Sequence, residues 1–302
     1  MKHSLRNLAP GSFLLTALLA LGACSDGGDE PGPSGPNGSD AGANGDDGSN
    51  GTDPCKGDPD REGAVCVETL DVTLDDEEGD PIEGVTVFCC GTDICSAPVA
   101  TDAEGKAHIE VNSYMLNPAF KVAGGSKYIS FAAPLPEGET KAVFPPTTLV
   151  AMPEEGVAFE IGTDQTLSSN DVHLEITSDT DVFIDELSLP DEEDQLFKAV
   201  QIPLDKAPPI GSPEGGLDAM FGLAPLATTF DPPAKLTLPN PQGWPAGTKV
   251  RVFAHGVEIA NEDAPYAGWG ELDADAVVSE HGMSIVLEAG TPLLTTIGLR
   301  QE

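Results

Sequence analysis

Cysteine is the most reactive residue type in this chain, and its positions divide into one isolated thiol and one cluster. Cys24 ends the apolar run "LLALGAC" and is followed at once by Ser, Asp and Gly. A thiol at such a boundary can be acylated, whereas clustered thiols can form disulfides or bind a metal as thiolates. The clustered thiols are Cys55, Cys66, Cys89, Cys90 and Cys95. Cys24 and the cluster therefore call for separate explanations.

The residues before Cys24 have the layout of an export signal. Lys2 and Arg6 precede an apolar run of roughly a dozen residues, which is too short to span a bilayer stably. The stretch "LGAC" at 21–24 resembles the lipobox of bacterial lipoproteins. This resemblance implies cleavage before Cys24 and its acylation with fatty acids such as palmitate. Ser25 then implies the outer membrane, facing the periplasm or the cell surface. An ordinary secretory signal with a chance cysteine is the alternative.

The remaining five thiols are expected to form disulfides, because the chain would be exported. Alternation places Cys66 and Cys89 on the inward faces of their strands. In one scheme these two residues form a bridge between two sheets, Cys90–Cys95 closes the tip "CCGTDIC", and Cys55 is left over. In the competing scheme Cys55 pairs with Cys66, and Cys89 is a free core thiol. Both schemes leave one odd cysteine.

A thiolate metal site is the other possible role of "CCGTDIC", with His108 as a further ligand. The segment lacks paired C-x2-C spacing, and zinc needs about four ligands. We therefore favour disulfides over a metal site.

The histidines offer little for catalysis. His108, His173 and His255 alternate with aliphatic residues, which predicts solvent-facing side chains, and His281 lies in the turn "SEHG". The segment "HGVE" at 255–258 has the H-x-x-E pattern that zinc carboxypeptidases use to bind their metal. No helix-period segments that could build such a catalytic domain follow, and H-E-x-x-H, G-x-S-x-G and phosphate-binding glycine loops are absent from the sequence. We expect no enzyme activity and no cofactor.

The net charge of the chain limits the classes of partner that it is expected to bind. With 14 basic and 51 acidic residues, the net charge is −37. Such a field repels nucleic acid and favours divalent cations or basic partners. Three acidic segments could bind Ca²⁺ through carboxylate oxygens: "DDGSNGTD" at 46–53, "DEED" at 191–194 and "DADA" at 273–276. None has the spacing of a helix-loop-helix calcium loop.

Composition divides the chain into four parts. Residues 1–23 are the predicted signal peptide, and residues 24–62 form the lipidated cysteine with a disordered acidic tether rich in Gly, Asp, Ser and Pro. Residues 63–152 and 153–302 follow as two modules. Their short alternating runs, separated by Gly and Pro turns, predict an all-β fold.

The first module resembles a known family through its turns. The stretch "VTLDDEEGDPIEGVTVFCC" followed by "TDAEGKAHIEV" is similar to the carboxypeptidase regulatory-like module, a transthyretin-like β-sandwich. The resemblance implies structural roles for the matched residues and no catalytic ones. The matched residues are Gly79, Pro81, Ile82, Gly84, Val85, Thr101, Asp102 and Gly105.

The second module shows six alternating runs: "VAFEIG", "DVHLEIT", "AVQIPL", "AKLTL", "TKVRVFA" and "MSIVLEAG". The stretch from Met220 to Ala254 resembles ZU5-like β-sandwich modules, and "GWGELDADAVVSEHGMSIVLEAG" is similar to a closing hairpin. The segment "DEEDQLFKAV" predicts one helical turn capped by Asp191, and "KAPPIGSPEGGLD" a long loop.

Together these patterns predict two tandem immunoglobulin- or transthyretin-like β-sandwich modules after a disordered acidic linker. The expected function is that of a lipid-anchored envelope protein that binds an envelope or extracellular protein or glycan, or that has a structural role. A calcium- or glycan-binding surface module is the alternative, and a zinc peptidase the remote one.

Overall fold

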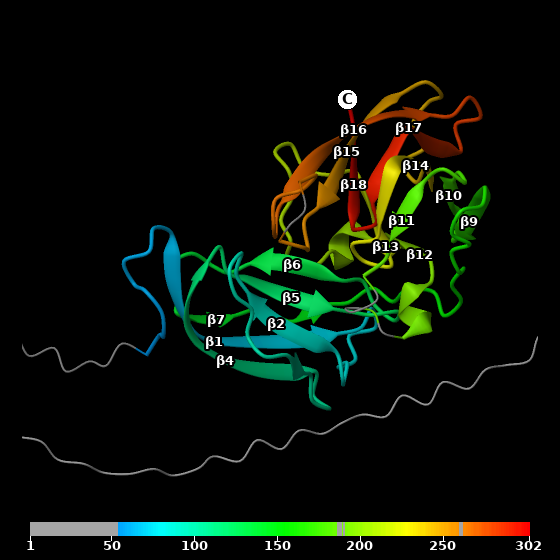
Figure 1. Ribbon diagram of the computed structural model, residues 1–302. Coiled ribbons are helices and arrows are strands. Elements are labelled where there is room, and N and C mark those ends of the chain that lie inside the picture. Colours follow the sequence, from blue (N-terminus) through cyan, green and yellow to red (C-terminus); the bar gives the residue numbers. More distant parts are fainter. Residues whose placement is uncertain (1–53, 186–188, 190, 260–261) are drawn as a thin grey trace, which may run out of the picture. The chain divides into compact units, whose positions relative to one another are not determined.

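The structure is a computed structural model that describes residues 54–185, 189, 191–259 and 262–302 (Figure 1). Strands dominate these residues, and the helical parts among them are two 3-10 turns, η1 (Glu192–Gln195) and η2 (Leu204–Lys206). The predicted all-β class is confirmed. The predicted signal peptide, the predicted lipid attachment at Cys24 and the calcium candidate at 46–53 lie outside the described residues.

The first half of the described chain forms two sheets around a common core. One sheet has the order β4-β1-β7, with β8 also paired to β1, and the other has the order β3-β2-β5-β6. β4 runs antiparallel to β1, whereas β7 and β8 run parallel to it. The strands are β1 (Ala64–Asp75), β2 (Thr86–Cys90), β3 (Val99–Ala100), β4 (Lys106–Leu116), β5 (Ala119–Ala123), β6 (Phe131–Pro134), β7 (Lys141–Val143) and β8 (Thr147–Thr148).

Alternating apolar residues explain why these segments are strands. Leu70 and Leu74 of β1, Val87 and Cys89 of β2 and Ile109 of β4 are all buried, as the period of two predicts. Their neighbours along each strand are partly or fully exposed, except Cys90 at the end of β2, which is also buried. Each sheet therefore presents one apolar face to the core.

The turns of this half use residues on which the family resemblance rests. Asp102 Oδ1 accepts hydrogen bonds from the backbone N–H groups of Glu104 (3.0 Å) and Lys106 (2.8 Å). Gly105 has φ +72°, and a Cβ there would lie 2.4 Å from the carbonyl oxygen of Leu74. Glycine is required at this position because it tolerates positive φ and leaves room for the neighbouring backbone.

The second half forms one ten-stranded sheet with the order β12-β13-β18-β15-β16-β17-β14-β10-β9, and β11 pairs with β14. Its two ends approach each other, since Asn170 Nδ2 donates to the carbonyl oxygen of Ala199 (2.9 Å) and the Ala199 N–H donates to Ser169 Oγ (3.0 Å). The sheet is therefore nearly closed around its own core. The strands are β9 (Gln165–Ser169), β10 (Val172–Ile176), β11 (Asp181–Phe183), β12 (Lys198–Ile202), β13 (Ala219–Ala224), β14 (Thr229–Pro239), β15 (Lys249–His255), β16 (Trp269–Val278), β17 (Ser284–Leu293) and β18 (Ile297–Gln301).

The two halves share a hydrophobic cluster. The core of the first half also contains Ile202, Ile210 and Met220 from the second half. Gly222 in β13 permits this contact, because a Cβ there would lie 2.6 Å from Cγ2 of Ile129. Gly51–Glu302 accordingly forms one compact unit.

A bulge in β1 reverses which face its residues occupy. The N–H groups of Glu68 and Thr69 both donate to the carbonyl oxygen of Thr140, at 2.6 and 3.3 Å, and the pairing with β4 shifts here. A bulge changes the phase of side chains on its two sides. Val67 is consequently fully buried, and Cys66 is displaced from the inward face that simple alternation predicts.

The pairing of Cys66 agrees with its displacement from the inward face. Cys55 bonds to Cys66, Cys90 bonds to Cys95, and Cys89 is a free buried thiol. The predicted Cys66–Cys89 bridge is therefore wrong, and the competing scheme is confirmed.

The start of the folded chain also differs from the expectation. Residues 54–62 were expected in the tether, yet Cys55 is buried and the Lys56 N–H donates to the carbonyl oxygen of Asn112 at 2.8 Å. The Cys55–Cys66 bond and this pairing attach the segment to β1 and β4.

In the second half, "VAFEIG" is not a strand. It makes a single bridge, between Val157 and Phe197, and Ile161 is exposed. The predicted helical turn is present as η1, but Asp191 makes no side-chain capping hydrogen bond. The segment after η2 is a loop, as expected, and buries Ile210.

Candidate functional site

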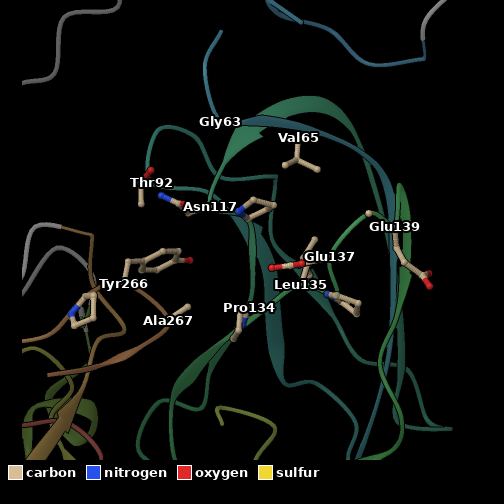
Figure 2. Close-up of a pocket in the computed structure, with 14 residues that line it drawn as sticks. Gly63, Val65, Thr92, Asn117, Pro134, Leu135, Glu137, Glu139, Tyr266 and Ala267 are labelled. Carbon is tan, nitrogen blue, oxygen red and sulfur yellow. The ribbon is translucent and has the colours of Figure 1, made fainter. Parts of the chain in front are cut away.

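A groove of about 710 Å³ lies where the two halves meet, and we take it as the candidate site (Figure 2). Five segments line it. The first half contributes residues 63 and 65 around the start of β1, residue 92 of the tip between β2 and β3, residues 117 and 118 between β4 and β5, and residues 134–139 from the end of β6 into the loop that follows. The second half contributes the loop 265–267. A volume in this range is typical of sites that enclose a drug-sized ligand.

The Cys90–Cys95 disulfide closes the tip that carries Thr92. The Thr92 N–H donates to the carbonyl oxygen of Leu116 at 2.7 Å, and the Leu116 N–H donates to Asp93 Oδ1 at 2.9 Å. Asp93 also forms an ion pair with Arg61. Although desolvation acts to raise it, the pKa of Asp93 is lowered by the Leu116 hydrogen bond and by the Arg61 guanidinium. The disulfide thus closes the tip on itself, the two hydrogen bonds with Leu116 hold the tip against the end of β4, and the ion pair with Arg61 ties it to the segment before β1.

Proline shapes the loop after β6. Pro134 and Pro136 flank Leu135, whose N–H donates to the carbonyl oxygen of Pro118 at 3.1 Å. Proline fixes its own φ and restricts the residue before it, so the loop has little conformational freedom. Gly138 then adopts φ +79° and reverses the chain. This wall of the groove is therefore largely preformed.

Tyr266 forms the opposite wall. Its hydroxyl donates to the carbonyl oxygen of Cys90 at 3.3 Å, and its ring packs beside the small cluster of Ala119, Ala132, Val257 and Ala267. Desolvation is the main cause that raises the pKa of the Tyr266 phenol, so the hydroxyl stays protonated at neutral pH. Tyr266 therefore joins the second half to the disulfide-closed tip and leaves part of its ring to the groove.

The hydrogen-bonding groups of the groove are mostly acceptors, and the side-chain amide of Asn117 is the main exception. Four of its residues are prolines, which offer a carbonyl oxygen and no N–H, and two are glutamates, which are acceptors when ionised. No lysine, arginine or histidine is among the residues that line it. The four prolines are Pro118, Pro134, Pro136 and Pro265, and the two glutamates are Glu137 and Glu139.

The H-x-x-E pair, considered above only as a remote zinc-binding pattern, lies outside the residues that line the groove. His255 was expected to face solvent, but it is fully buried and lies 5.1 Å, centroid to centroid, from the Trp269 ring. Both ring nitrogens lack a hydrogen-bond partner in the described structure. Desolvation lowers the pKa of His255 to about 3, so the ring is neutral at physiological pH. Glu258 forms an ion pair with Lys121 at 2.7 Å.

The solvent-facing prediction is correct for the other histidines. His108 is exposed and lies 2.7 Å from Asp71 Oδ1, and His173 is exposed and lies 2.8 Å from Ser168 Oγ. His281 is also exposed. His255 differs from them because other parts of the chain cover both faces of β15 at this position.

The described residues hold no group of three or more His, Cys, Asp or Glu side chains arranged to bind a metal. "DADA" lies in β16, where Asp273 and Asp275 are exposed and the alanines between and after them are buried. "DEED" lines a separate hollow of about 690 Å³ opposite residues 124–127. The thiolate metal site at "CCGTDIC" is contradicted, because Cys90 and Cys95 are joined as a disulfide.

Sequence reasoning did not identify the groove. Its most characteristic segment, "PLPEGE" at 134–139, has prolines and then glutamates at alternate positions, and no role was predicted for it. Tyr266, one of only three tyrosines, lies in a Gly- and Pro-containing loop that faces it across the groove. Rare aromatics in loops were the available signal, since binding residues concentrate on loops.

Comparison with known proteins adds no assignment. No helix within the described ranges is both long and apolar enough to cross a membrane. No protein-family model matches the chain, and no curated protein matches it.

Proposed function

We propose that this protein is a lipid-anchored envelope protein that binds a ligand in the groove between its two halves without transforming it chemically. The observation that carries the proposal is the groove itself, which is lined by five segments of the chain. A disulfide, a proline-rich loop and the hydrogen bond from Tyr266 to Cys90 hold its walls in place. Such preorganisation favours binding, because little conformational entropy is lost when the ligand enters.

The anchor is part of the proposal through Cys24. Attachment of two or more acyl chains holds a protein on a membrane durably, at about 0.8 kcal/mol for each buried CH₂. We propose that the acidic stretch after Cys24 serves as a spacer. Metabolic labelling with palmitate should mark the wild-type chain and leave Cys24→Ser unmarked, and a labelled variant would remove the anchor from the proposal.

A blocking substitution tests the groove. Pro136 is exposed and lines the groove, so Pro136→Trp should fill it without disturbing a core. Pro241 is exposed in the turn after β14, and Pro241→Trp is the matched control. The full chain in non-ionic detergent would be screened on peptide and glycan arrays. We expect wild type and Pro241→Trp to share ligands that Pro136→Trp loses; equal binding by all three would exclude the groove.

The glycan alternative has one specific observation in its favour, the Tyr266 ring exposed to the groove. Aromatic faces pack against apolar ligand surfaces of many kinds. Groove-dependent binding to neutral glycans on the same arrays would select this alternative.

A further inference from the structure

The walls of the groove define the chemistry of its ligand. Prolines and carboxylates supply most of the acceptors, and three of the donors are already used, while the Asn117 amide adds a further side-chain donor. The Tyr266 hydroxyl donates to Cys90, the Ala267 N–H donates to Gly256 at 2.7 Å, and the Thr92 N–H donates to Leu116. A ligand that covers these acceptors should supply hydrogen-bond donors to them, because acceptors left without partners in a desolvated site are unfavourable.

Charge points in the same direction. Within the described residues, no ion pair involves Glu137. The basic side chains on neighbouring segments are occupied: Arg61 pairs with Asp93, and Lys141 Nζ lies 3.3 Å from Glu68 Oε2. The field of a chain with net charge −37 also attracts cations from a distance. The groove is therefore complementary to a positively charged ligand.

The two glutamates are not equivalent. Figure 2 shows the Glu137 carboxylate pointing across the groove in the direction of Tyr266, whereas the Glu139 carboxylate points away from it. Figure 2 shows the hydroxyl end of Tyr266 directed into the groove, so a cation between the two side chains would meet the Glu137 carboxylate on one side and the Tyr266 phenol oxygen on the other. The Tyr266 proton is donated to Cys90, and the phenol oxygen can therefore accept a hydrogen bond from an ammonium or guanidinium group. This places the centre of recognition at Glu137.

Size and apolar surface indicate what carries the cation. The groove of about 710 Å³ is larger than one lysine or arginine side chain needs. Beside Glu137 it continues along Pro134, Leu135 and Val65. An extended polypeptide fits this arrangement, because its alternate side chains can occupy neighbouring subsites.

We propose, building on the function proposed above, that the groove binds an extended segment of a basic polypeptide. A lysine or arginine side chain of that segment lies between the Glu137 carboxylate and the Tyr266 hydroxyl. Its apolar neighbours pack against the proline-rich loop. The partner is thus a cationic protein or peptide at the envelope.

The test is a fluorescence polarisation titration of the full chain in non-ionic detergent. The probes are equal-length peptides in which the same apolar and proline residues flank lysine, arginine, glutamine or glutamate. We expect the lysine and arginine peptides to bind, the other two to bind at least tenfold more weakly, and high salt to reduce the difference. Glu137→Gln should weaken lysine-peptide binding by about fivefold.

Two controls separate local from global charge. Glu139→Gln removes the same charge from the same loop but from a carboxylate that points away, and Glu280→Gln removes it from the exposed β16–β17 turn. Each should change affinity less than about twofold. Equal effects of all three substitutions would overturn the assignment of Glu137.

Other results separate this inference from the proposed function. If only neutral glycans bind and Pro136→Trp abolishes that binding, the groove is a binding site and the basic-peptide inference is wrong. If a linear polyamine competes as well as the lysine peptide, the polypeptide part is wrong. If no array ligand depends on Pro136, both proposals fail.

Discussion

β1 in the first half and β15 in the second are both central strands, and they differ in what covers their two faces. Along β1 beyond its bulge, Leu70 and Leu74 are buried while Asp71 between them is partly exposed. Along β15, Val252 is buried on one face, and His255 is fully buried on the other. Alternation of apolar and polar residues therefore predicts which side chains are buried when one face of a strand is solvated. It gives the wrong prediction when protein covers both faces.

The largest expected effect is on stability, when a charge is placed on the buried face of β15. His255→Glu places an unpaired charge in a fully buried site, which should lower the free energy of unfolding by roughly 4 kcal/mol. His173→Glu, on an exposed face, should change it by less than about 0.5 kcal/mol. Urea unfolding followed by tryptophan fluorescence measures both.

Equal values for the two substitutions would contradict the burial of His255. If His255→Glu does not fold, His255→Leu provides the second measurement. It removes the nitrogens and keeps a similar volume, so it should fold with stability close to that of wild type.

The burial of His255 should also make the free energy of unfolding depend on pH, which is a smaller effect. The pKa of His255 in the folded state is about 3, below its value of about 6.5 in an unfolded chain, so between these values unfolding takes up a proton. Stability is therefore complete above pH ~6.5 and falls as pH decreases. The expected loss is about 1 kcal/mol per pH unit between pH ~6.5 and ~4.5, before most carboxylates titrate.

His255→Leu should flatten this slope at pH above about 4.5, and His173→Gln should leave it unchanged. Urea midpoints measured across the same pH range report the slope for each variant. A wild-type slope that survives in His255→Leu would assign the effect to other groups.

The same contrast explains how much the sequence predicts. The faces of Leu70, Val87 and Ile109 are predictable because each belongs to a strand with one solvated side. The outward displacement of Cys66 is not, because its bulge depends on the carbonyl of Thr140, more than seventy residues away. The burial of His255 depends likewise on segments distant from β15.

The groove, too, could not be predicted from the sequence. Each of its segments, taken alone, is a turn or the end of a strand. Tyr266 reaches the disulfide-closed tip only because the second half packs against the first, where Gly222 allows close contact with Ile129. Sequence patterns identify such turns, but not which distant turns will meet.

The smallest expected effect concerns the thiol that the β1 bulge leaves unpaired. Cys89 is fully buried, its Sγ lies 3.8 Å from Met115 Sδ, and burial raises its pKa to about 12. Because thiolate is the reactive form, iodoacetamide should modify Cys89 rapidly only after unfolding. Cys89→Ala should cost about 1 kcal/mol, since it removes one buried atom and breaks no covalent bond. Peptide mapping without reduction should recover Cys55–Cys66 and Cys90–Cys95 in both proteins; a peptide linking Cys66 to Cys89 in the wild type would mean that β1 has no phase reversal.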